Sequence, residues 1–148
     1  MTLLNGKGSY GMNGNKAVLD SNFLILLSKG KIDWEPLRAR YDKLYASIIT
    51  YIEVYGYNFA DEDQKTSLDD VFNYLEIIEV GSEIADQAII YRKSTTKKIK
   101  LPDAVILASA KRADADLITD NYKDFFSIDP SINVISLDGL KVEPKANS

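Results

Sequence analysis

The sequence contains no cysteine and no histidine among its 148 residues. Without cysteine there is no disulfide framework, and without both residue types the usual zinc sites are excluded. The lack of histidine also excludes imidazole acid–base catalysis and any catalytic triad that depends on it. A catalytic metal would therefore be held by oxygen ligands, which favours magnesium or manganese over zinc, copper or iron.

Long apolar runs and a signal peptide are also missing. No segment reaches the length that crosses a bilayer, and residues 1–16 have neither an apolar centre nor a small-residue cleavage site. We therefore expect a cytoplasmic protein without a membrane partner. Hydrophobic residues make up 45% and charged residues 27% of the chain, the balance of one globular domain. We predict that domain over residues 16–143, with 1–15 as a flexible leader or an artificial extension and 144–148 as a tail.

Positive charge is not in excess. The formal net charge is -4, and the pI of the sequence is about 4.9. This balance argues against a protein that coats nucleic acid by neutralising phosphates. An enzyme acting on RNA stays open, because a nuclease that holds divalent cations brings their positive charge to the scissile phosphate.

Short apolar segments alternate with helical patterns along the chain. Residues 17–19 predict a buried strand and residues 23–27 a short buried helix. Residues 47–50 indicate a second strand with a helix behind it, in which Thr50 and Glu53 have the spacing of a capping box. Such alternation predicts the α/β class, with helices on both faces of a mainly parallel sheet.

The second half of the chain continues this alternation. The predicted elements are a loop at 61–67, an amphipathic helix at 68–78, a short strand at 77–81, a helix capped by Ser82, a basic loop at 92–100, a helix at 102–113, a strand at 117–119, a turn and short helical segment at 120–126, and a strand at 132–137.

Acidic residues stand at strand ends or helix starts in four places, Asp20, Glu53, Asp103 and the pair Asp120 and Asp124. In an open parallel sheet, ligand sites form beyond the carboxyl ends of the strands, where the strand order reverses. Carboxylates gathered there repel one another, so they either titrate abnormally or bind a divalent cation. A cation held in this way serves the hydrolysis of phosphodiester bonds.

Each acid also has a purely structural interpretation. Asp20 can cap the following helix, and Glu53 can belong to a capping box. Asp103 can complement the dipole of the helix that it begins. Asp120 and Asp124 can be ordinary turn and cap residues. Taken singly, these positions do not decide between a structural and a chemical role.

Four short motifs, taken in order, resemble those of PIN-domain nucleases. They are Ala17-Val18-Leu19-Asp20-Ser21-Asn22, Ile52-Glu53-Val54 with Gly56, Leu101-Pro102-Asp103-Ala104, and Leu117-Ile118-Thr119 through Asn121 to Asp124-Phe125. The resemblance extends over about residues 16–138 and points to the VapC toxins of bacterial and archaeal toxin–antitoxin pairs. It implies a three-layer α/β/α domain that cuts RNA with magnesium or manganese and leaves a 5'-phosphate and a 3'-hydroxyl.

The resemblance also assigns roles to individual residues. The catalytic and metal-binding acids that it implies are Asp20, Glu53, Asp103 and Asp124. Asn22 would support the first of these acids by hydrogen bonding. Either Asp120 or Asn121 would orient a ligand or a water molecule, and which of the three residues after the fourth strand completes the site stays open.

The stretch at 92–100 contains five basic residues and ends just before the third motif. Its members Lys97, Lys98 and Lys100 are candidates for contact with RNA. The alternative is a solvated loop, because charge runs are commonly that.

The resemblance to VapC toxins further implies a homodimer and a small antitoxin whose tail occupies the acidic groove. Two rival interpretations stay open. One is a housekeeping RNA-processing PIN nuclease without an antitoxin, and the other is a non-catalytic PIN-fold binding module that has lost the metal. The acids at all four motif positions count against the second rival.

Overall fold

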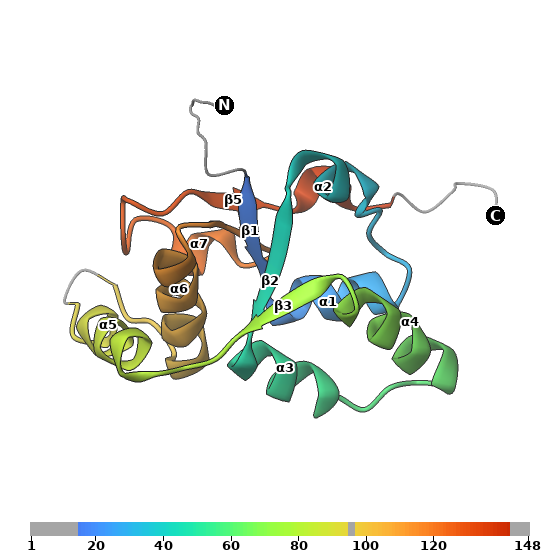
Figure 1. Ribbon diagram of the computed structural model, residues 1–148, viewed down its shortest axis with the longest axis horizontal. Helices are drawn as coiled ribbons and strands as arrows, with labels where there is room; N and C mark the ends of the chain where they lie inside the picture. Colours follow the sequence, from blue (N-terminus) through green and yellow to red (C-terminus); the bar gives the residue numbers. More distant parts are fainter. Residues whose placement is uncertain (1–14, 95–96, 143–148) are drawn as a thin grey trace.

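The structure, a computed structural model, describes residues 15–94 and 97–142. A five-stranded sheet runs through the domain in the order β3-β2-β1-β4-β5 (Figure 1), and its four neighbouring strand pairs are all parallel. The strands are β1 (Lys16–Leu19), β2 (Lys43–Ser47), β3 (Leu75–Ile78), β4 (Asp116–Thr119) and β5 (Val134–Ser136). The predicted tail, and the predicted leader apart from residue 15, lie outside the described residues.

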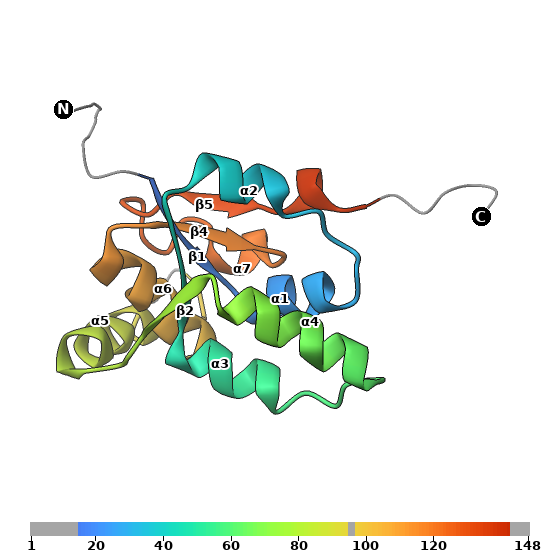
Figure 2. The ribbon, with the colours of Figure 1, turned by 45° about the vertical axis from the view of Figure 1, so that its right-hand side comes forward.

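Helices cover both faces of the sheet, which gives the three layers of the predicted α/β/α architecture (Figure 2). They are α1 (Ser21–Ser28), α2 (Glu35–Arg40), α3 (Ile48–Tyr55), α4 (Glu62–Phe72), α5 (Ser82–Arg92), α6 (Leu101–Ala113) and α7 (Tyr122–Phe125), followed by the 3-10 turn η1 (Asp138–Leu140). Along β1, Ala17 and Leu19 pack into a core with α1 and α4, while Val18 points into a second core with α5 and α6. This alternation is the period of a strand buried on both faces, and it confirms the predicted fold class.

The start of α3 differs from the prediction. The helix begins at Ile48, and the hydroxyl of Ser47 caps it by accepting a hydrogen bond from the Ile49 amide at 3.2 Å. The strand predicted here therefore ends at Ser47, and the capping box between Thr50 and Glu53 is wrong. The β-branched pair after Ser47 favours a strand in isolation, but the cap and the packing of the helix between the two cores override that preference.

The starts of two further helices, α4 and α5, were predicted at the wrong residues. The predicted loop at 61–67 is the beginning of α4, because the Asp61 side chain accepts a hydrogen bond from the Gln64 amide at 3.0 Å and so starts the helix on its polar, solvent-facing side. Ser82 is the first residue of α5 and not its cap, a position that Gly81 occupies without a side-chain hydrogen bond. The short helix α2 was not predicted at all.

The arrangement of the strands creates a switch point at the centre of the sheet. After β1 the chain builds β2 and β3 on one side, and it then returns to place β4 and β5 on the other side. The carboxyl ends of β1 and β4 therefore lie side by side with their following segments diverging, which leaves a crevice between them. Asp20 follows β1 directly, and Asp120 follows β4.

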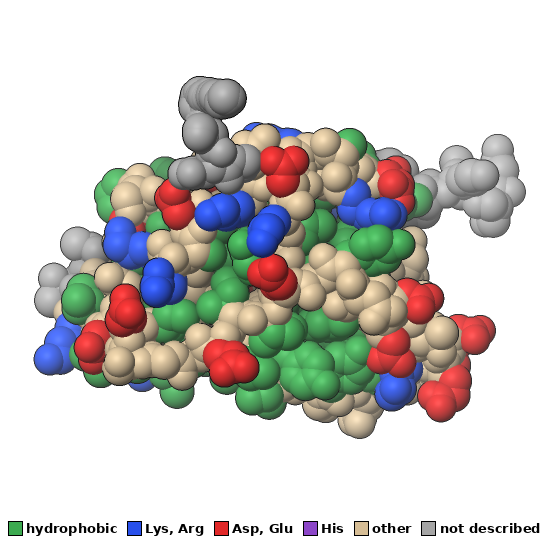
Figure 3. Space-filling model, viewed as in Figure 1, with side chains coloured by type: hydrophobic (Ala, Val, Ile, Leu, Met, Phe, Trp, Pro, Cys, Tyr) green, Lys and Arg blue, Asp and Glu red, His purple; other side chains and the backbone are tan. Residues whose placement is uncertain are grey.

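Some large hydrophobic side chains remain at the surface. On the face that Figure 3 shows, hydrophobic side chains gather over the region of α3 and α4. Tyr51 of α3 is 42% exposed and its ring centroid lies 5.5 Å from that of Phe72 of α4, and Ile52 of α3 is 60% exposed. Within residues 15–94 and 97–142, no helix combines the length and the hydrophobicity that a membrane crossing requires.

Candidate metal-binding site

A cavity of about 190 Å³ opens at the carboxyl ends of β1 and β4. Its acidic lining consists of Asp20, Glu53, Asp103 and Asp124, which come from the segment after β1 and from α3, α6 and α7. The other lining residues are Ser21, Asn22, Lys100, Pro102, Ile106 and Asn121. Four carboxylates from positions 20 to 124 of the chain thus line one small cavity together with a single lysine.

Asp20 is the buried acid of the cavity lining and is only 3% exposed. Its Oδ1 accepts a hydrogen bond from the Phe23 amide at 2.9 Å, and its Oδ2 accepts one from the Thr119 hydroxyl. Burial raises the pKa of Asp20 to about 6, although these two hydrogen bonds oppose the rise. Asp20 therefore caps α1 and also lines the cavity, so its capping role does not exclude a chemical one.

Glu53 reaches the cavity from the middle of α3. Its Oε1 accepts a hydrogen bond from the Ser21 hydroxyl at 2.5 Å, which joins α3 to the first residue of α1. No role was predicted for Ser21 from the sequence. The available signal was its place next to Asp20 in the first motif, because a residue adjacent to one site acid on a helix start is well placed to hold another.

Asp103 stands in the first turn of α6, as predicted. Its pKa is raised, first by burial and then by the negative charges of Asp124 and Glu53, while Lys100 lowers it. The charges of Asp103 and Asp120 likewise add to the rise at Asp20. Asp103 and the acids around it therefore act on one another electrostatically, as carboxylates gathered in one place do.

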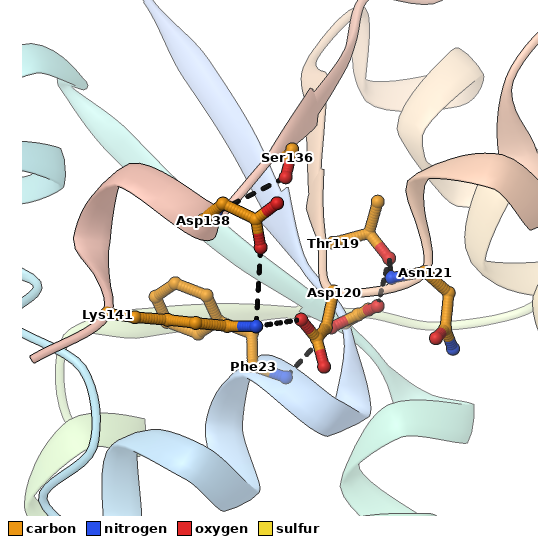
Figure 4. Close-up of polar contacts among 8 residues, drawn as sticks. Phe23, Thr119, Asp120, Asn121, Ser136, Asp138 and Lys141 are labelled. Carbon is orange, nitrogen blue, oxygen red and sulfur yellow. Dashed lines mark hydrogen bonds and ion pairs between the residues drawn. The ribbon is translucent and has the colours of Figure 1, made fainter. Parts of the chain in front are cut away.

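The three candidates after β4 behave differently. Asn121 and Asp124 line the cavity, whereas Asp120 does not. The Oδ1 atom of Asp120 lies 3.0 Å from the Nζ atom of Lys141 (Figure 4). The Asn121 amide donates to the Thr119 hydroxyl at 2.8 Å, which fixes the turn that sends these neighbours in different directions.

The remaining predicted residues are placed as follows. Asn22 lines the cavity but is exposed, and the described contacts of the Asp20 carboxylate come from Phe23 and Thr119. Among the described residues no hydrogen bond joins Asn22 to Asp20, and the supporting role of Asn22 stays a prediction. The Thr119 hydroxyl donates a hydrogen bond to the Asp20 carboxylate. The sequence signal for this contact was the place of Thr119 at the end of the strand in the fourth motif.

The three candidate lysines are not equivalent. Lys100 is the N-cap residue of α6, without a side-chain capping hydrogen bond, and it lines the cavity. Lys97 lies with its Nζ atom 3.4 Å from the Phe126 carbonyl oxygen, and Lys98 is exposed. Only Lys100 therefore adds its charge to the cavity lining.

The donor chemistry of the cavity fits a hard divalent cation. Carboxylate and amide oxygens are the ligands that magnesium and manganese prefer, and the buried Asp20 with its raised pKa gains a counterion when a cation binds. Among the described residues, no three carboxylates are already gathered at the distances of a finished metal cluster. Binding would therefore require these side chains to close around the ion.

A wider cavity of about 420 Å³ lies at the amino ends of β2 and β3, at the other end of the sheet. Its acids Asp42 and Glu76 are accompanied by Arg38 and Lys43, and the last lies 3.4 Å from Glu76. Charges of both signs are balanced there, so nothing in that lining demands a cation. The smaller cavity is the candidate site.

Comparison with known protein families matches residues 17–129 to the PIN domain. The chain belongs to the PIN-domain family. Among solved structures, this PIN domain is similar to a toxin–antitoxin complex from Klebsiella pneumoniae, with 34% identity, a TM-score of 0.65, and coverage of 78% of this chain and 94% of that chain. Comparison with curated protein sequences finds no match.

Two more distant structures share the fold. VapBC2 from Rickettsia felis, bound to a DNA fragment from its promoter, has 23% identity and a TM-score of 0.72 over 83% of this chain and 99% of that chain. DNA-bound VapBC from Salmonella typhimurium has 23% identity and a TM-score of 0.68 over 83% of this chain and 98% of that chain. The whole length of these relatives therefore corresponds to the domain described above.

Proposed function

We propose that this PIN domain is a metal-dependent ribonuclease that hydrolyses RNA phosphodiester bonds, and that it is the toxin of a VapBC-type toxin–antitoxin pair. The observation that carries the proposal is the shared cavity of Asp20, Glu53, Asp103 and Asp124 at the switch point of a parallel sheet. A chain without histidine or cysteine has few other means of hydrolysing a phosphodiester.

The four acids would hold magnesium or manganese, with Asp20 and Asp103 as the principal ligands and Glu53 and Asp124 completing the site directly or through water. When bound, the cation supplies a Lewis acid that activates water and offsets the phosphate charge. The Phe23 amide and the Thr119 hydroxyl hold the Asp20 carboxylate in one orientation.

The other polar residues of the cavity would prepare it for the RNA. Ser21 holds the Glu53 carboxylate at the junction of α1 and α3. Asn121, beside Asp124, offers an amide that can orient a ligand or a water molecule. Lys100 brings positive charge to the rim, where it would meet the RNA backbone, and Lys97 and Lys98 extend the same approach more weakly.

Substitution of the two principal acids tests the nuclease activity. Asp20→Asn and Asp103→Asn should abolish Mg²⁺-dependent cleavage of a mixed-sequence RNA, while circular dichroism shows a retained fold. Asp86→Asn, at an exposed position of α5, is the matched control and should cleave like the wild type. Full activity of both site variants, or wild-type activity that persists in EDTA, would refute the proposal.

A small antitoxin is the proposed protein partner. The support is the 34% identity to a chain of a toxin–antitoxin complex, together with the exposed Tyr51 and Ile52 of α3 on a hydrophobic face of the domain (Figure 3), which is typical of a surface that another protein covers. The acidic cavity beside α3 would accept a basic tail. Homodimer formation stays a prediction from the family resemblance.

Expression in a bacterial host separates a toxin from a housekeeping nuclease. Induction of the wild type should arrest growth, and induction of Asp103→Asn at the same protein level should not. Normal growth with active wild-type protein would leave the nuclease standing and remove the toxin assignment.

A further inference from the structure

Lys141 holds two carboxylates beside the candidate site without lining the cavity. Its Nζ atom lies 3.0 Å from Asp120 and 3.3 Å from Asp138 (Figure 4). The backbone amide of Asp138 donates a hydrogen bond to the Ser136 hydroxyl at 3.2 Å, which fixes the main chain at this residue. The ammonium group thus joins the segment after β4 to the segment after β5.

The main chain fixes the position of Lys141 independently of its side chain. Residues Ile32 and Lys141 form an antiparallel bridge. On either side of this bridge, the Val142 amide donates to the Lys31 carbonyl at 2.9 Å, and the Asp33 amide donates to the Leu140 carbonyl at 3.0 Å. A change of the Lys141 side chain therefore leaves its backbone anchored.

Asp120 is the partner of Lys141 that comes from the segment after β4. It stands between Thr119, which is hydrogen-bonded to Asp20, and Asn121, which lines the cavity. Without its counterion, Asp120 would be a fifth carboxylate at the edge of the acidic cavity, one peptide unit from residues that belong to it.

We propose that Lys141 is a positioning residue of the metal site, which holds the Asp120 carboxylate outside the cavity and restricts the acidic lining to Asp20, Glu53, Asp103 and Asp124. This inference rests on the proposed metal-dependent function. It explains why Asp124 and not Asp120 faces the cavity, although Asp120 is closer to the end of β4. It also means that a residue from the end of the domain sets the charge of the site.

The pair has a definite effect on cation affinity. In the native arrangement the charge of Asp120 is offset by Lys141, so a divalent cation gains little from it. Removing the ammonium group leaves Asp120 uncompensated and free to turn toward the ion. We therefore expect Lys141→Met to tighten Mn²⁺ binding by about three- to tenfold, the size expected of one unit charge near a solvated edge.

The test is calorimetric titration of the whole protein with Mn²⁺ alone. Lys141→Met should bind more tightly than the wild type, Lys141→Arg should bind like the wild type, and Lys141→Met combined with Asp120→Asn should return to wild-type affinity. Lys43→Met is the matched control, since Lys43 also pairs with a carboxylate, Glu76 at 3.4 Å, but at the other end of the sheet. Its affinity should not change.

The pattern distinguishes positioning from a merely structural contact. If Lys141 only stabilised the fold, Asp120→Asn would not reverse the effect of Lys141→Met. Equal Mn²⁺ affinity of wild type and Lys141→Met, or a tightening that persists in the double variant, would overturn the inference and leave the proposed function intact. A wild type that does not bind Mn²⁺ would overturn both.

Discussion

The Thr119 hydroxyl donates a hydrogen bond to the Asp20 carboxylate and so joins the ends of β4 and β1 across 99 positions of sequence. The same hydroxyl accepts a hydrogen bond from the Asn121 amide at 2.8 Å. It is thus the donor to Asp20 and the acceptor for Asn121. A donor aimed at a buried carboxylate favours the charged form, which is the form that a cation requires. Thr119 therefore counteracts the effect of burial on this acid.

Replacement of Thr119 by valine should weaken both the fold and the site. The variant keeps the shape of the side chain but removes the donor to Asp20 and the acceptor for the Asn121 amide, so we expect a loss of about 1–3 kcal/mol in the free energy of unfolding. The pKa of Asp20 should rise further and Mn²⁺ affinity at neutral pH should fall. Urea denaturation and calorimetry measure the two effects. Thr119→Ser, which retains the hydroxyl, should lie close to the wild type, and equal behaviour of valine and serine variants would contradict this role.

Stability of the metal-free protein should depend on the protonation of Asp20. Its pKa in the fold is about 6, above its ordinary value of 3.8, so the folded state binds the proton more tightly than the unfolded chain. The stabilising contribution is complete below the ordinary pKa and is lost as the pH rises through about 6, with an upper size of ~3 kcal/mol. Thermal melting across this pH range, with Asp20→Asn as the reference that lacks the titration, isolates the effect.

Cation binding should show the opposite trend with pH. A proton on Asp20 competes with Mn²⁺, so the affinity should fall by about tenfold for each pH unit below the pKa of about 6. The raised pKa of Asp103 makes the fall steeper. Titrations above and below this pKa measure it. A Mn²⁺ affinity that stays constant across the range would exclude Asp20 as a ligand.

Ser21→Ala should reduce activity without unfolding the protein. The variant removes the hydrogen bond that holds Glu53, and outer-shell contacts of this kind are worth about tenfold or more in activity or metal affinity. Ser82→Ala is the matched control, because Ser82 is likewise the first residue of a helix and is exposed, but lies on α5. Cleavage rates of the two variants decide the point, and a similar loss in both would show that the effect is not specific to Glu53.

The lysines should differ in their effect on RNA binding. Lys100→Met should raise the KM for RNA several-fold and reduce the salt dependence of binding, because its charge lines the cavity. Lys98→Met, which removes the same charge from an exposed position, should have the smaller effect. Steady-state kinetics at two salt concentrations compares them, and the reverse order would remove Lys100 from the RNA path.

Much of the fold was predictable because local patterns carry it. The apolar run before Asp20 and the Pro102-led helix formers predicted β1 and α6 within a residue or two. The start of α3 was not predicted, since Ile48 and Ile49 favour a strand locally, and the Ser47 cap together with packing against the two cores makes them helical. The polar start of α4 was mistaken for a loop because its exposed face has the composition of one.

The sequence by itself determined the chemistry that is available, since the absence of histidine and cysteine and the acids at four motif positions leave an oxygen-ligand site as the main option. Only the tertiary structure decided which carboxylates share the cavity. Three residues after β4 were candidates from the sequence, and Lys141, which comes from the segment after β5, pairs with Asp120 outside the cavity while Asp124 lines it. Spacing along a chain cannot specify such a choice, because the direction of a side chain depends on partners that folding brings from elsewhere.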